Sequence, residues 1–113
     1  MIQILHNPRC RKSREALALL EAEGQNFMVI KYLEDKLTVK NLTTIISKLD
    51  ISPIDLVRKN EAIWKSEFKG KDLNDAKIIE AMVANPKLIE RPIVINKNKA
   101  VIGRPLDAIK TIL

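Results

Sequence analysis

The sequence of 113 residues predicts one α/β domain, residues 1–113, built on a mixed four-stranded sheet. Three observations lead to this fold class. A strand, a helix and a second strand follow one another near the N-terminus, which is typical of a right-handed βαβ unit with parallel strands. Two further strands near the C-terminus flank a short turn and form an antiparallel hairpin. Between these pairs lies a stretch with helical periodicity, interpreted as an insertion of about 38–89.

In the first half, apolar periodicity alternates between strand and helix patterns. Gly24 takes the position just after the first helix, and Thr38 is the expected N-cap of the second. The expected segments are a strand at 1–5, a helix at 15–23, a strand at 27–32 and a helix at 39–49.

In the second half, prolines and glycines delimit short helices before the hairpin. Ser52-Pro53 begins a short helix, Gly70 ends another, and Pro105 is expected at the first position of the last. The expected segments are helices at 53–57, 61–68, 74/75–84 and 106–113, one turn at 86–89, and strands at 92–95 and 99–102.

Composition limits the classes of function. Lys and Arg total 20 against 14 Asp and Glu, a formal net charge of +6, which fits an anionic substrate. Aromatic residues are only 4%, so a base-stacking platform for nucleic acid is not expected. The sequence shows no signal-peptide pattern and no membrane-spanning apolar run. We expect a cytoplasmic monomer that binds no metal and no membrane.

One stretch, residues 6–14, concentrates the only histidine, the only cysteine and four cations. Cys10 is expected in a strand-to-helix turn, at or next to the helix N-terminus. Unpaired N–H groups and the helix dipole stabilise a thiolate there, so the pKa of Cys10 should lie below that of a free thiol. The same N–H groups and nearby guanidinium groups can hold an oxyanion. An inert buried cysteine is the alternative, which an arginine-rich turn disfavours.

Two neighbours of Cys10 have two interpretations each. His6 is either a plain loop residue or a partner that hydrogen-bonds or charge-pairs with the thiolate. Ser13 is either an ordinary first-turn residue or a hydrogen-bond donor to the Cys10 sulfur. Ser13 also stands where a Cys-x-x-Cys motif would place its second cysteine, so a disulfide at Cys10 needs a thiol from another molecule.

The order of elements is that of a thioredoxin-like fold, with the helical insertion between the second and third strands. In that fold, the residue before a cis-proline faces the active-site turn. X-Pro bonds are the usual place for a cis peptide, and Arg91-Pro92 precedes the third expected strand. We therefore predict a cis Arg91-Pro92 bond that places Arg91 beside the Cys10 loop.

Several motifs together resemble the glutaredoxin-coupled arsenate reductase family, the ArsC/Spx-like branch of thioredoxin folds. The resemblance covers the chain from residue 2 to about 113, and the chain is similar to the shorter members, which lack a C-terminal extension. No single motif is specific, but their combination is. The matching residues are His6 to Cys10, Ser13-Arg14, Arg58, Arg91-Pro92 and Gly103-Arg104-Pro105.

The resemblance implies an enzyme that reduces arsenate to arsenite. Cys10 would be the nucleophile, and His6 would help to keep it ionised. Glutathione would then attack the arsenic and glutaredoxin would take the glutathione, both as external reductants without a bound cofactor. The implied oxyanion ligands are Arg58, Arg91 and Arg104. The implied supporting residues are Asn7, Ser13 and Pro92.

Physical chemistry supports the arginines in this role. Arsenate is a tetrahedral dianion, and arginine forks bind such oxygens bidentately without losing their charge. One position departs from the family pattern, because Arg11 and Lys12 stand where many members have Gly and Thr. Bulky basic residues at this turn can alter the loop shape and the anion preference.

Three other functions are considered. Arsenate reductases built like small tyrosine phosphatases need Cys-x5-Arg, and Ala16 at that position excludes them. Spx-type proteins share the fold and bind RNA polymerase to regulate transcription, but their redox switch is a Cys-x-x-Cys pair that Ser13 removes. A glutathione-linked thiol oxidoreductase that does not act on arsenate remains open.

Overall fold

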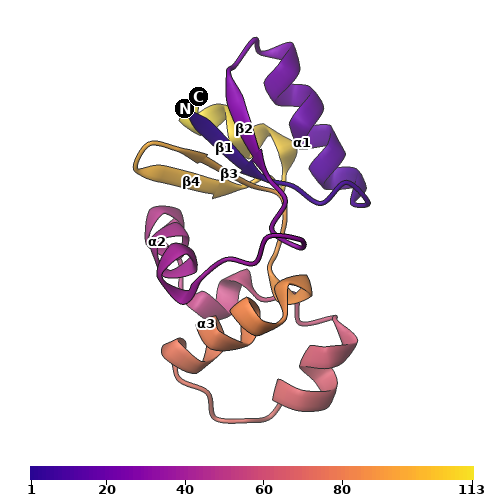
Figure 1. The fold of residues 1–113 in the computed structure, drawn as a ribbon, viewed down its shortest axis with the longest axis vertical. Coiled ribbons are helices and arrows are strands. Elements are labelled where there is room, and N and C mark those ends of the chain that lie inside the picture. Colours follow the sequence, from indigo (N-terminus) through magenta and orange to yellow (C-terminus); the bar gives the residue numbers. More distant parts are fainter. The chain divides into compact units, whose positions relative to one another are not determined.

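The computed structural model describes all residues, 1–113, and divides into two compact units. One unit comprises residues 1–35 and 91–113 and contains the sheet. The other comprises residues 36–90 and contains the helices inserted between β2 and β3 (Figure 1). These helices lie between the second and third strands, where the sequence predicts an insertion.

The sheet has the strand order β2-β1-β3-β4. β1 (Ile2–Leu5) pairs in parallel with β2 (Phe27–Ile30), as a βαβ unit requires. On its other side β1 pairs antiparallel with β3 (Ile93–Asn96), which forms a hairpin with β4 (Lys99–Ile102). The predicted thioredoxin-like mixed sheet of four strands, with an insertion between the second and third, is therefore confirmed.

One face of the sheet is covered by α1 (Arg11–Ala22) and by the 3₁₀ segment Leu106–Ile112. Burying a side chain such as isoleucine contributes roughly 1.5–3 kcal/mol, so this packing holds α1, and the turn before it, against the end of β1. The buried cluster consists of Ile2, Ile4, Ala16, Leu20, Val94 and Ile109.

In the helical unit, polar caps set the starts of both long helices, as predicted. α2 (Val39–Leu49) begins at Thr38, whose hydroxyl accepts the Asn41 N–H at 3.0 Å. α3 (Asp75–Ala84) begins at Asn74, whose side chain accepts the N–H of its third helical residue at 2.9 Å. The two helices contact each other through apolar faces, and their buried residues include Leu42, Ile45, Ile46, Ile78 and Met82.

Three predicted helices differ from the structure. α1 begins at Arg11 rather than at residue 15, because Cys10 already accepts the first helical hydrogen bond. Of the predicted helix at 61–68, Trp64–Phe68 forms a π-helical turn, with its two aromatic rings stacked. The last helix is a 3₁₀ segment. Pro105 is its N-cap rather than its first residue, because the backbone of Pro105 is extended (ψ 163°).

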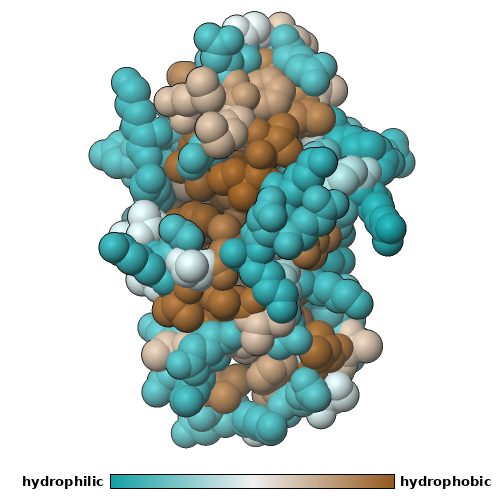
Figure 2. Space-filling view, viewed as in Figure 1, coloured by the Kyte–Doolittle hydropathy of each residue, from teal (hydrophilic) through white to brown (hydrophobic).

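No helix in this chain is both long and apolar enough to cross a membrane. Hydrophilic side chains cover much of the face shown in Figure 2, with apolar atoms between them. The large apolar side chains that are exposed are Met1, Met28, Val29, Leu33, Val39 and Leu113.

Candidate active site

Cys10 is the N-cap residue of α1, with an extended backbone (φ −94°, ψ 121°). Its carbonyl accepts the Arg14 N–H at 3.0 Å, which starts the helix, and its own N–H donates to the Asn7 carbonyl at 2.9 Å. The residue is only 8% exposed. The thiol thus lies at the positive end of the helix dipole, as the sequence predicts.

Two guanidinium groups reach the Cys10 sulfur. Arg91 Nε donates to Sγ at 3.2 Å, and Arg104 Nη2 donates to Sγ at 3.9 Å. The Arg91-Pro92 bond is cis, as predicted, and so is Arg104-Pro105, which sequence reasoning missed. Arg91 and Arg104 stand 81 and 94 positions from Cys10 in the sequence. The fold therefore brings three of the predicted site residues together.

The pKa of Cys10 is lowered, although burial alone would raise it. The hydrogen bond from the Ser13 backbone, the charge and hydrogen bond of Arg91, and the hydrogen bond from the Lys12 backbone each favour the thiolate and together outweigh burial. The two backbone contributions belong to the first turn of α1. Helix and arginine thus act on the same sulfur.

Ser13 uses its hydroxyl to join His6 to the loop before Cys10. Its Oγ lies 2.7 Å from His6 Nδ1 and accepts the Asn7 N–H at 2.9 Å. Ser13 is fully buried and His6 is 7% exposed, so these contacts are shielded from water. Asn7 in turn accepts the Arg9 N–H on Oδ1 at 3.0 Å. The predicted supporting residues Asn7 and Ser13 therefore fix the turn.

Burial lowers the pKa of His6 below its ordinary value of 6.5. The hydrogen bond with Ser13 raises the pKa, and the positive charges of Arg14 and Lys31 lower it further, so the net shift is downward. A lowered pKa favours the neutral ring, whereas a charge pair with the Cys10 thiolate needs the protonated ring. The ring contacts the Ser13 hydroxyl at 2.7 Å, and its predicted role toward Cys10 stays a prediction.

Two contributions to the site were not anticipated. Arg14 Nη1 donates to the Pro8 carbonyl at 3.0 Å and holds the loop from the helix side. Gly103 packs so tightly on the cis-proline that an added Cβ would lie 2.9 Å from Pro92 Cγ. Both residues stand in motifs on which the family resemblance rests, Ser13-Arg14 and Gly103-Arg104. A motif predicts that a residue lies near the site, but it does not predict which atoms the residue contacts.

Arg11 and Lys12, which depart from the family pattern, are directed to Glu15. Arg11 Nε lies 3.2 Å and Lys12 Nζ 3.9 Å from its carboxylate oxygens. The side chain of Arg11 is 84% exposed and that of Lys12 54%. One negative charge thus partly offsets the two cations. Both residues belong to the first turn of α1, which begins at Arg11.

Arg58 lies in the helical unit. Its N–H donates to the Leu88 carbonyl at 2.7 Å, next to the isolated β-bridge between Val57 and Ile89. Its guanidinium contacts Glu61 Oε2 at 3.4 Å. The predicted role of Arg58 as an oxyanion ligand stays a prediction.

The groups around Cys10 suit nucleophilic attack on an oxyanion. A thiolate of lowered pKa can act as a nucleophile, and guanidinium groups and helix N-terminal N–H groups beside it can offset the negative charge of an anion. No three side chains of the types His, Cys, Asp and Glu gather where they could hold a metal ion.

Comparison with known proteins agrees with this geometry. The chain matches the model of the ArsC family over residues 5–112. It is 42% identical to an arsenate reductase of Haemophilus influenzae, over 97% of this chain and 97% of that relative. It is 39% identical to an arsenate reductase of Neisseria meningitidis serogroup A, over 99% of this chain and 97% of that relative. A solved structure of an arsenate reductase from Vibrio cholerae matches with a TM-score of 0.95 and 41% identity, over 99% of this chain and 97% of that one. A sheet of this topology, a cysteine at the helix N-terminus and likeness along nearly the whole chain agree, and the chain belongs to the ArsC family.

Proposed function

We propose that this protein reduces arsenate to arsenite, with Cys10 as the nucleophile. The observation that carries the proposal is the hydrogen bond from Arg91 Nε to Cys10 Sγ at 3.2 Å, with Arg104 Nη2 at 3.9 Å. A guanidinium carries five N–H donors in a planar fork whose geometry matches the oxygens of an oxyanion. The names of the relatives support arsenate as that anion.

The proposed reaction begins when the Cys10 thiolate attacks As(V), forming an S–As bond while one oxygen leaves as water. Glutathione then adds its sulfur to arsenic and displaces a second oxygen as water. A glutaredoxin thiolate attacks the glutathione sulfur, and the electron pair of that S–As bond stays on arsenic, which becomes As(III). Water finally releases arsenite and returns the Cys10 thiolate. The scheme uses one protein thiol, in agreement with the single cysteine.

Arg91 and Arg104 are proposed to bind the oxyanion, with Arg58 as a third ligand suggested by the family resemblance. Their positive charge reduces the repulsion between a thiolate and a dianion, which is the main obstacle to attack. Removing one such donor from a transition state costs about 2.7–4 kcal/mol in enzymes that stabilise oxyanions. Arg104 Nε donates a hydrogen bond to the Arg91 carbonyl at 2.8 Å, which supports the proposal that the two arginines bind the oxyanion together.

The test is arsenate-dependent NADPH oxidation with glutathione, glutaredoxin and glutathione reductase, as expected for a cytoplasmic enzyme with external reductants. We expect activity in the wild type, none in Cys10→Ser, and none when glutaredoxin is omitted. Activity of the Cys10→Ser variant would contradict the proposal. Reduction of a glutathione mixed disulfide without any response to arsenate would favour the thiol oxidoreductase instead.

A further inference from the structure

The contacts of Arg58 in the helical unit carry a further inference. Its Nη2 lies 3.4 Å from Glu61 Oε2, and its Nη1 donates to the Lys87 carbonyl at 3.3 Å. The side chains of Arg58 and Glu61 are 25% and 27% exposed, so water screens the pair only in part. The Glu61 N–H also donates to the Arg58 carbonyl at 3.1 Å, which keeps both residues in one turn. A carboxylate is thus tied to a guanidinium.

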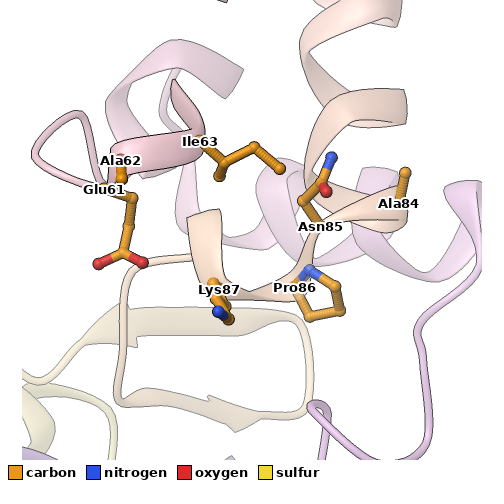
Figure 3. Close-up of a pocket in the computed structure, with 7 residues that line it drawn as sticks. All are labelled: Glu61, Ala62, Ile63, Ala84, Asn85, Pro86 and Lys87. Carbon is orange, nitrogen blue, oxygen red and sulfur yellow. The ribbon is translucent and has the colours of Figure 1, made fainter. Parts of the chain in front are cut away.

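Glu61 also lines a cavity of about 410 Å³ that leaves its carboxylate room to move. Ile63 and Pro86 contribute apolar walls, and Lys87 brings a second cation to the same cavity. Figure 3 shows the Glu61 carboxylate and the Lys87 side chain at the same end of this pocket. The carboxylate therefore has an alternative cationic partner within its own unit.

We propose that Glu61 is an internal competitor of the oxyanion. Its carboxylate holds Arg58 while the enzyme is empty, and moves toward Lys87 when the oxyanion takes the guanidinium. This inference rests on the proposed function, in which Arg58 binds the oxyanion. Because a carboxylate and a tetrahedral oxyanion use the same N–H fork, Glu61 raises the oxyanion concentration at which Arg58 is occupied. Glu61 touches no reacting atom, so it is a positioning residue that sets affinity.

The test is Glu61→Gln, which keeps the shape of the side chain and removes its charge. Titration with inorganic phosphate, followed by the NMR signal of the Arg58 Nε–H group, should give a Kd about two- to fivefold lower than in the wild type, the range of a partly exposed ion pair. In arsenate turnover, KM should fall by the same factor while kcat stays nearly constant. Glu80→Gln is the matched control, because Glu80 pairs only with Lys77, at 3.4 Å, and should leave both constants unchanged.

Two further variants make the outcomes distinct. Arg58→Ala should weaken phosphate binding, and adding Glu61→Gln to it should change nothing more. An unchanged Kd in Arg58→Ala would remove Arg58 from the proposed oxyanion site itself. If Arg58→Ala weakens phosphate binding but Glu61→Gln does not strengthen it, the competitor role is overturned while the oxyanion site stands.

Lys87→Met tests the alternative partner of the Glu61 carboxylate. It should weaken phosphate binding when Glu61 is present but not in the Glu61→Gln variant. An equal loss of affinity in both backgrounds would overturn the exchange of partners.

Discussion

Arg104 donates its Nε–H to the main-chain carbonyl of Arg91 at 2.8 Å, while its Nη2 reaches the Cys10 sulfur at 3.9 Å. One guanidinium therefore contacts both the nucleophile and the backbone of the second arginine. Arg91 itself donates to the sulfur at 3.2 Å. The position of Arg91 and the charge of Arg104 are thus coupled, and loss of one side chain should disturb the other.

We expect Arg104→Lys to lower arsenate kcat/KM by about 10²-fold, on the scale of one lost oxyanion contact. A lysine is a point charge on a flexible stem and cannot bond the Arg91 carbonyl and an anion with the geometry of a fork. The double variant Arg91→Ala/Arg104→Ala should lose less than the product of the two single losses, because the residues act as a unit.

The control for this experiment is Arg11→Lys, a replacement of an arginine that is 84% exposed at its side chain and pairs with Glu15. Its kcat/KM should stay within about twofold of the wild type, as for a surface ion pair. Equal losses in Arg11→Lys and Arg104→Lys would mean that net charge, not the contacts of Arg104, controls activity.

The second prediction concerns the ionisation of Cys10. The rate of iodoacetamide alkylation against pH should show an inflection below that of a free thiol, because the pKa of Cys10 is lowered. Arg91→Ala should move the inflection upward, because it removes a positive charge and a hydrogen bond from the thiolate. Arg91→Lys should restore part of the shift. An inflection in the wild type at the free-thiol value would contradict the lowered pKa.

Much of the fold follows from local patterns, which explains which features could be predicted. The span of α2 is predicted by a cap at Thr38 and apolar spacing, and the position of Cys10 follows from a strand meeting a helix. Contacts between distant residues have no local signal. The bond from Arg14 to the Pro8 carbonyl and the packing of Gly103 on Pro92 depend on how the chain folds back, so a linear pattern does not reveal them.

The third prediction uses the single histidine, whose imidazole signals can be followed by NMR against pH. The pKa of His6 should lie below 6.5, mainly because the ring is buried. Arg14→Met removes a positive charge that lowers this pKa, so it should move the pKa back toward 6.5. Arg11→Met, which removes a charge that does not act on His6, should leave it unchanged.

The lowered pKa of His6 has a consequence for stability. Between its folded pKa and 6.5 the unfolded state binds more protons, so the free energy of unfolding falls as pH falls. The contribution of His6 is fully present above 6.5 and is lost as pH drops through the folded value. The free energy of unfolding, measured with urea, should fall more steeply over this pH window in the wild type than in His6→Gln. Parallel pH dependences of the two proteins would contradict this contribution of His6.

The fourth prediction concerns the buried hydroxyl of Ser13, which contacts His6 Nδ1 and accepts the Asn7 N–H. Ser13→Ala leaves both partners without this bond in a buried place, so the free energy of unfolding should fall by about 1–3 kcal/mol. Ser66→Ala removes an exposed hydroxyl that makes one long contact of 3.4 Å, and should change stability by less than about 0.5 kcal/mol. Equal effects in urea unfolding would contradict the role of Ser13.

The last prediction tests the packing beneath the cis-proline. In Gly103→Ala the new Cβ would lie 2.9 Å from Pro92 Cγ and 3.1 Å from Ile109 Cδ1, so one of these groups must shift. Overpacking of this kind costs about 1–3 kcal/mol of stability. Because Pro92 follows Arg91 directly, a shift of its ring should also weaken the bond from Arg91 to Cys10 and raise the pKa of that thiol.

The matched control is Ile109→Val, which destabilises the same region by about 0.5–1.5 kcal/mol by removing a methylene, without crowding the proline. Its alkylation profile should keep the wild-type inflection, whereas that of Gly103→Ala should move upward. Both variants are compared by urea unfolding and by alkylation against pH. A Gly103→Ala protein that loses stability but keeps the wild-type inflection would show that Gly103 serves packing alone, without positioning Arg91.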